Sequence, residues 1–276
     1  MEKIHAVKGG GGLNLHVREW GNSDGAAILL IHGWSQNHLS WRKQYESSLA
    51  EDFRLVALDL RGHGMSEAPL EAENYTDAQL WADDIDAIIE QLNLSRPVLV
   101  GWSYGGFIVS DYVRACGQSA IAGVNYVGAA VTLNEGAFGT LIGPGFLNNA
   151  EGAMAPDLPT NIEAMRNFLH DCLVKPIPQE DFEVALAFNV AVSAQVRAGL
   201  TTREINSDDI LEAMTVPVLV THGQEDIVIL PTMGEHILNT CPSAKASWYE
   251  GVGHLPFMEN PERFNQELAA FTQQAQ

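Results

Sequence analysis

The sequence predicts an α/β fold with a mostly parallel, doubly wound sheet. Short, continuous apolar runs rich in Val, Leu and Ile recur along the chain, and several of them end at glycine. Continuous apolarity, as opposed to alternation, is typical of strands that are covered on both faces, as in a parallel sheet. Helical patterns separate these runs, and such an alternation of strands and helices is the signature of the class.

Five buried strands are expected from these runs, at 26–33, 54–60, 97–101, 122–128 and 217–223. Apolar residues at helical spacing predict helices over 75–92, 107–114 and 261–271. The last of these begins with proline, which suits the first turn of a helix. The glycines at 9–12 precede "LNLHVREW" and predict a turn between two N-terminal strands, not a dinucleotide-binding loop.

One long segment interrupts this rhythm. From 133 to 210 there is no clear buried-strand run, and helix-like pieces occur near 162–174 and 181–196. A long excursion inside a compact α/β domain is commonly a lid over a site. We therefore expect a core domain formed by 1–132 and 211–276, with residues 133–210 as an inserted, mainly helical cap.

Charge and cysteine content exclude several classes of partner. The 276-residue chain has a formal net charge of −20, which argues against binding to nucleic acid or to an anionic membrane. No 18-residue apolar run is present, and the N-terminus lacks the apolar core of a secretory signal. The three cysteines, Cys116, Cys172 and Cys241, show no CxxC spacing and are expected to be reduced thiols in a cytoplasmic protein.

Ser103 is the first candidate catalytic residue. It lies in "VLVGWSYGGFIVSDYV", in a Gly-x-Ser-x-Gly pattern between a buried strand and a helix. A serine at such a sharp turn has a strained backbone that projects its hydroxyl from the edge of the sheet. The following backbone N–H, that of Tyr104, lies at a helix N-terminus and can face developing negative charge.

A serine hydroxyl needs a base, and the base needs an orienting carboxylate. His254 is the expected base because it lies in a glycine-flanked loop, "EGVGHLPF", before the last helix. Asp226 is the expected acid because it follows a strand end, with Glu225 beside it as the alternative. Three other downstream histidines are expected to be structural or exposed: His170, His222 and His236.

A second oxyanion donor is expected from the loop that leaves the strand at "ILLIHGW". The backbone N–H of Trp34 lies in this loop, upstream of the serine. The Trp34 side chain and Leu255 are expected to line the substrate pocket.

Together these stretches resemble the α/β-hydrolase superfamily. The resemblance covers nearly the whole chain and rests on five motifs in family order: "HGW" at 32–34, "DLRGHGMS" at 59–66, "GWSYGG" at 101–106, "GQEDIVI" at 223–229 and "GVGHLPF" at 251–257. It implies an α/β-hydrolase fold, a Ser103–Asp226–His254 triad, oxyanion N–H groups of Trp34 and Tyr104, and a cap inserted after the sixth strand. "HGW", Trp41 and "RGHGMS" look most like the non-haem haloperoxidase and esterase members.

Other candidate residues receive a structural interpretation. Asp59, Arg61 and His63 shape a loop in the family and are expected to do so here. The turn between the predicted buried strand and the following helix carries a serine, Ser103, at the position where epoxide hydrolases and dehalogenases carry an aspartate. Neither of those activities is therefore expected. The nine histidines show no HExxH spacing and no Cys/His cluster, so we expect neither a metal nor a cofactor.

The expected function is hydrolysis of small carboxylic esters through an acyl-enzyme, with water as the second substrate. The same triad and oxyanion groups would also serve C–C bond hydrolysis, lactone opening or peracid formation. The alternative to an enzyme is a binding protein that uses this fold to sense a ligand. The cap is rich in large apolar side chains and has only four scattered basic residues: Arg166, Lys175, Arg197 and Arg203. We therefore expect a preference for neutral, moderately apolar esters.

Overall fold

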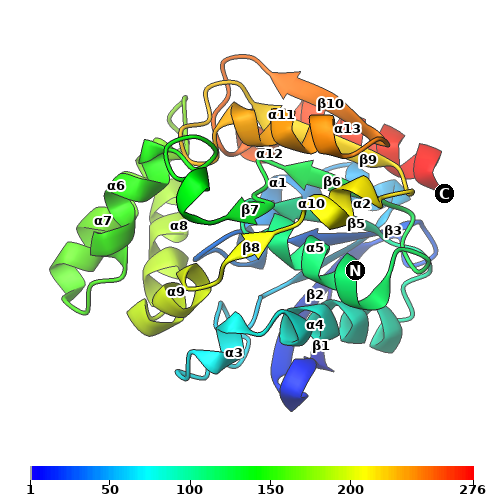
Figure 1. The fold of residues 1–276 in the computed structure, drawn as a ribbon. Coiled ribbons are helices and arrows are strands. Elements are labelled where there is room, and N and C mark those ends of the chain that lie inside the picture. Colours follow the sequence, from blue (N-terminus) through cyan, green and yellow to red (C-terminus); the bar gives the residue numbers. More distant parts are fainter. Residues whose placement is uncertain (1) are drawn as a thin grey trace.

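A computed structural model describes residues 2–276 and contains an eight-stranded sheet at its centre (Figure 1). The strand order is β1-β2-β4-β3-β5-β6-β9-β10. The β1–β2 and β2–β4 pairs are antiparallel, and every other neighbouring pair is parallel. The strands are β1 Lys3–Lys8, β2 Asn14–Gly21, β3 Ala27–Ile31, β4 Arg54–Leu58, β5 Val98–Trp102, β6 Gly123–Val127, β9 Val218–Gly223 and β10 Ala244–Tyr249.

The five apolar runs of the sequence form β3, β4, β5, β6 and β9. Both faces of the sheet are covered, as two glycines demonstrate. A Cβ on Gly101 would meet Val109 of α5 (Gly105–Cys116), and a Cβ on Gly123 would meet Phe271 of α13 (Pro261–Ala275). Gly123 pairs with Val98, three residues before Gly101, so the two glycines face opposite sides of the sheet. The doubly wound prediction is confirmed.

The expected helix over 75–92 is divided in two. A short helix, α3, covers Glu73–Thr76, and α4 covers Ala78–Gln91. Asp77 separates them because its side chain accepts the N–H of Gln79 and thereby caps α4. The remaining helices outside the segment 133–210 are α1 Arg42–Tyr45, α2 Leu49–Asp52, α11 Pro231–Thr240 and α12 Pro256–Glu259, with the 3-10 turns η1 Gly10–Gly12 and η2 His38–Trp41. The turn η1 lies between β1 and β2, as the glycine run predicted.

The segment between β6 and β9 is mainly helical. Its helices α6 to α9 lie beside the sheet, at the left of Figure 1, with α6 packed against α7 and α7 against α8. The helical piece expected at 181–196 is two helices, because the chain turns at Ser193, which caps α9. Two short antiparallel strands, β7 and β8, were not predicted. The elements are β7 Thr132–Leu133, η3 Glu135–Ala137, α6 Pro144–Ala153, α7 Leu158–Asp171, α8 Gln179–Ala191, α9 Ala194–Thr201, β8 Ile205–Asn206 and α10 Asp208–Glu212.

A division into core and cap at 133 and 210 stays a prediction.

In residues 2–276, no helix alone is long and apolar enough to cross a membrane. Only α8 and α9 taken together, bent by 79°, reach that length and composition.

Candidate active site

Ser103 lies in the turn between β5 and α5 in a left-handed conformation, with φ of 55°. Few non-glycine residues adopt such an angle, and here hydrogen bonds hold it. The Ser103 N–H donates to the carbonyl of Val127 (3.1 Å), and the Ser103 carbonyl accepts the N–H groups of Gly106 and Ala130 (2.9 and 3.0 Å). The flanking Gly105 permits the turn, since a Cβ there would lie 2.5 Å from the carbonyl oxygen of Ile31.

His254 and Asp226 meet at the carboxyl end of the sheet. Asp226 follows β9, His254 follows β10, and His254 Nδ1 lies 2.7 Å from Asp226 Oδ2. Both residues are 1% exposed. An ionised carboxylate only accepts hydrogen bonds, so Nδ1 carries the proton and, in the neutral ring, Nε2 has a free lone pair. His254 Nε2 is buried and has no partner among the described residues.

The environment of Asp226 favours its charged form. Burial alone would raise its pKa, but His254 and His222 outweigh this and lower the pKa of Asp226 to about 2. Its Oδ1 accepts the N–H groups of Val228 and Ile229 (2.8 and 3.0 Å). Asp226 is therefore an anion at neutral pH, held in position by the backbone.

Glu225, the alternative acid, is exposed and turned elsewhere. Its carboxylate accepts the N–H of Val252 at 3.2 Å. Among the histidines given a structural role, His222 lies 3.4 Å from Asp226 Oδ2 and 2.9 Å from the carbonyl of Ile229. Sequence reasoning missed this second imidazole beside the acid. His170 stacks on Phe182, and His236 bonds to Asp208.

Two further contacts connect the Ser103 turn with His254. Trp102, next to Ser103, donates its indole N–H to the carbonyl of His254 (3.0 Å). Gly128 follows Val127, the partner of the Ser103 N–H, and a Cβ on Gly128 would lie 3.2 Å from His254 Nδ1 and 3.3 Å from Asp226 Oδ2. Three chain segments thus pack around one point. Sequence reasoning did not identify Trp102 or Gly128.

The two proposed oxyanion residues both lie beside Ser103. Trp34 follows Gly33, whose Cβ would come within 2.8 Å of Ser103 Cβ, and Tyr104 directly follows Ser103. Within residues 2–276, neither the Trp34 nor the Tyr104 backbone N–H donates a hydrogen bond to a protein group. Free N–H groups next to a nucleophile are what an oxyanion requires.

An apolar cavity opens at Ser103. No charged side chain lines it within the described part of the chain. The segment 133–210 supplies much of its wall. The lining includes Trp34, Tyr104, Phe107, Phe146, Phe168, Leu200, Thr201 and Ile229. Leu255, expected to line the substrate pocket, lies instead in a separate groove between α1 and the helices α7 and α8. A role for Leu255 at the substrate stays a prediction.

Asp59, Arg61 and His63 have structural partners. Arg61 forms a buried pair with Asp84 (2.7 Å), and His63 accepts the N–H of Ser35 (3.2 Å). Asp59 accepts both the backbone N–H and the Nδ1–H of His38, at 2.8 and 2.7 Å.

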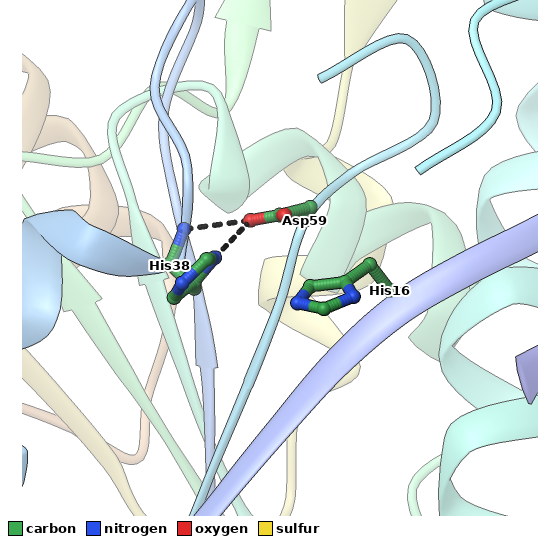
Figure 2. A group of neighbouring side chains, drawn as sticks. All are labelled: His16, His38 and Asp59. Carbon is green, nitrogen blue, oxygen red and sulfur yellow. Dashed lines mark hydrogen bonds and ion pairs between the residues drawn. The ribbon is translucent and has the colours of Figure 1, made fainter. Parts of the chain in front are cut away.

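The His16 ring faces this Asp59–His38 pair, as Figure 2 shows. Their possible ligand atoms lie within 4.8 Å of one another. The cluster was not predictable from the sequence because His16, His38 and Asp59 belong to separate segments. One oxygen of Asp59 is occupied by His38 and the other accepts the Met65 N–H, so we interpret the cluster as a structural anchor of this loop and not as a metal site.

Residues 28–267 match the model of the alpha/beta hydrolase family, and the chain belongs to this family. The structure is similar to that of the esterase RhEst1 from Rhodococcus sp. ECU1013, with 34% identity, a TM-score of 0.93 and 99% of each chain covered.

Two curated relatives extend the comparison. The chain is 27% identical to the bifunctional esterase/perhydrolase DCH of Acinetobacter calcoaceticus, covering 94% of this chain and 96% of that one. It is 26% identical to the non-heme chloroperoxidase of Streptomyces lividans, with the same coverage. The chain is thus a hydrolase of the esterase and haloperoxidase-like branch.

Proposed function

We propose that the protein is a serine hydrolase that cleaves small, neutral carboxylic esters through an acyl-enzyme. The observation that carries this proposal is the buried Asp226–His254 pair, in which His254 Nε2 has no partner among the described residues. The pair is connected to the Ser103 turn by Trp102, whose indole N–H donates to the His254 carbonyl. The cavity at Ser103 favours an uncharged, apolar substrate, because none of the described residues that line it is charged.

In the first half of the reaction, Ser103 Oγ attacks the ester carbonyl while His254 Nε2 takes the hydroxyl proton. The carbonyl oxygen becomes an oxyanion, which the N–H groups of Trp34 and Tyr104 stabilise. His254 then returns the proton to the departing alkoxide, and the alcohol leaves. Asp226 stabilises the transient imidazolium and keeps the ring in the required tautomer.

In the second half, His254 removes a proton from water, and the hydroxide attacks the acyl-enzyme. The C–O bond to Ser103 breaks, Ser103 Oγ regains the proton, and the carboxylic acid is released. The cap residues at the cavity, Phe146 and Phe168 among them, exclude bulk water around the acyl group.

A screen of uncharged p-nitrophenyl esters with graded acyl chains tests this function. We expect multiple turnover that is abolished in Ser103→Ala, together with an optimum in chain length set by the cavity. Tight retention of ligand without turnover would favour the binding-protein alternative, and cleavage confined to lactones or to C–C bonds of diketones would reassign the reaction.

Peracid formation is a second candidate, favoured by the relative named an esterase/perhydrolase. Hydrogen peroxide would replace water as the attacking nucleophile on the acyl-enzyme, giving a peracid with the same proton transfers. Monitoring peracid by a halide-oxidation assay at fixed ester and rising peroxide tests it, because Ser103→Ala should abolish both products.

A further inference from the structure

Arg197 is a buried cation without a carboxylate partner. Its side chain lies in α9 and is fully inaccessible to solvent, yet no acidic group in residues 2–276 forms an ion pair with it. The other two fully or nearly buried arginines in the described chain, Arg61 and Arg203, pair with Asp84 and Asp111. A buried charge is costly unless it is compensated, so Arg197 must find its compensation elsewhere.

Two helix ends supply that compensation. Nη1 of Arg197 donates to the carbonyl of Ala153, the last residue of α6. Nη2 donates to the carbonyls of Asn189 (2.7 Å) and Val190 (3.4 Å) in the last turn of α8. The final carbonyls of a helix lack intrahelical donors and carry partial negative charge, so they suit a guanidinium. Arg197 therefore ties the ends of α6 and α8 to α9.

The same residue also contacts the loop that contains Trp34. Nε of Arg197 donates to Ser35 Oγ at 2.9 Å, and the Arg197 carbonyl accepts the indole N–H of Trp34 at 3.4 Å. Two consecutive loop residues thus bond to a single residue of α9.

Ser35 itself is held in an uncommon conformation, with φ of 64°. Its backbone N–H donates to His63 Nε2, and its hydroxyl donates to the Asn189 carbonyl at 3.1 Å. A non-glycine residue keeps such an angle only where its surroundings fix it. The link to Arg197 is one of the contacts that fix the backbone directly after Trp34.

We propose that Arg197 is a positioning residue that couples the cap segment to the Trp34 N–H, so that the oxyanion donor is aligned only when α6, α8 and α9 are assembled over the site. This inference rests on the proposed function, because it requires Trp34 to bind an oxyanion. Arg197 does not line the cavity at Ser103, so it acts through Ser35 and Trp34 and not on the substrate.

Three variants and one control test the coupling: Ser35→Ala, Arg197→Lys, Arg197→Gln and, as the control, Arg166→Gln. Ser35→Ala removes the two bonds of the loop hydroxyl, to Arg197 Nε and to the Asn189 carbonyl, and leaves the bonds from Arg197 to the ends of α6 and α8. Arg197→Lys keeps the charge but not the forked donors. Arg166 is an exposed cap arginine, so its loss should change nothing. For each variant, kcat and KM on a neutral p-nitrophenyl ester, Tm, and Ki for a trifluoromethyl ketone are measured.

We expect kcat to fall by about 10-fold or more in Ser35→Ala and in both Arg197 variants, with KM changed by less than about threefold. The Ki for the trifluoromethyl ketone, which forms an oxyanion on the serine, should rise by the same factor as kcat falls, because both depend on the Trp34 N–H. Arg166→Gln should match the wild type.

The proposal is overturned if Ser35→Ala folds normally and keeps both kcat and Ki, even if the Arg197 variants are unstable. It is also overturned if the Arg197 variants lower Tm but retain kcat and Ki, since Arg197 would then only hold the cap together. In both of these cases the wild type would still hydrolyse the ester and Ser103→Ala would not. If the proposed function itself were wrong, the wild type and Ser103→Ala would not differ in ester hydrolysis.

Discussion

Asp226 Oδ2 lies 2.7 Å from His254 Nδ1, and neither side chain is more than 1% exposed. When His254 takes a proton at Nε2, this contact becomes a buried ion pair in a low-dielectric environment. The stabilisation of the imidazolium is then far greater than it would be in water. The exposed Glu225, one residue away, gains nothing from the same event.

The two neighbouring acids should therefore differ sharply on substitution. We expect Asp226→Asn to lower kcat by on the order of 10³–10⁴, because asparagine donates a hydrogen bond and favours the wrong tautomer of His254. Glu225→Gln is the matched control and should retain kcat within about twofold. Steady-state kinetics on one neutral ester decide the matter, and similar losses in both variants would place the acid elsewhere.

Gly33 should not tolerate a side chain. A Cβ there would lie 2.8 Å from Ser103 Cβ and 3.3 Å from Ser103 Oγ. Gly33→Ala should displace Ser103 or the Trp34 backbone and lower kcat by about 100-fold.

Gly117→Ala is a control for adding a methyl group, because a Cβ at Gly117 would meet nothing within 4 Å. Its left-handed φ of 75° will cost stability, but its kcat should stay near that of the wild type. A fully active Gly33→Ala would contradict the packing of these two residues.

The enzyme should discriminate against anionic esters. None of the four basic residues of segment 133–210 lines the cavity at Ser103: Arg197 binds helix carbonyls, Arg203 binds Asp111, and Arg166 and Lys175 are exposed. A carboxylate in the cavity would lose its hydration without gaining a cation.

We expect kcat/KM for a neutral ester to exceed that for a carboxylate-bearing ester of equal size by about 10-fold or more. Raising the ionic strength should narrow this gap, because it screens the repulsion by a chain of net charge −20. A preference for the anionic ester would show that a cation reaches the substrate.

The stability of the protein should fall in mild acid because of His63. Complete burial lowers the pKa of His63 to about 4, against an ordinary value near 6.5. Between these two values the unfolded state binds more protons than the folded state, so the free energy of unfolding falls as the pH falls. The contribution of neutral His63 is fully present above pH 6.5 and is lost on acidification below it.

Urea denaturation of wild type and His63→Gln between pH 4.5 and 7.5 measures this effect. The wild-type free energy of unfolding should fall more steeply, by about 1.4 kcal/mol per pH unit between pH 6 and 4.5. Burial and the neighbouring His63 lower the pKa of His32 to about 3, so His32 adds a slope of the same sign in both proteins, and only the difference between the two profiles is assigned to His63. If the free energy of unfolding depended on pH in the same way in the wild type and in His63→Gln, His63 would not be held neutral in the folded protein.

The strands of the sheet were predictable because burial on both faces requires continuous apolar runs. All residues of β3 and β5 are buried, and both runs stand out in the sequence. A helix was expected near α8, but the face that it packs against the protein was not predictable in the same way. Its apolar residues surround the helix, with Phe182 buried and Val184 43% exposed, so periodicity could not show which face packs.

At the candidate site, chain order and loop position pointed to Ser103, Asp226 and His254. Contacts that depend on how the chain turns in space could not be anticipated in that way. His222 reaches Asp226 only because the chain turns sharply after β9, and Arg197 reaches Ser35 only because α9 folds over the loop. Leu255, expected to line the substrate pocket, lines another groove in the structure, and its role at the substrate stays a prediction.

The most direct test of the central claim is covalent labelling with a fluorophosphonate, followed by peptide mass spectrometry. We expect stoichiometric phosphonylation of Ser103, at a rate that falls by orders of magnitude in His254→Ala, with loss of ester hydrolysis in proportion to the labelled fraction. Labelling at any other serine, or ester hydrolysis that survives complete labelling of Ser103, would contradict the assignment of Ser103 as the nucleophile.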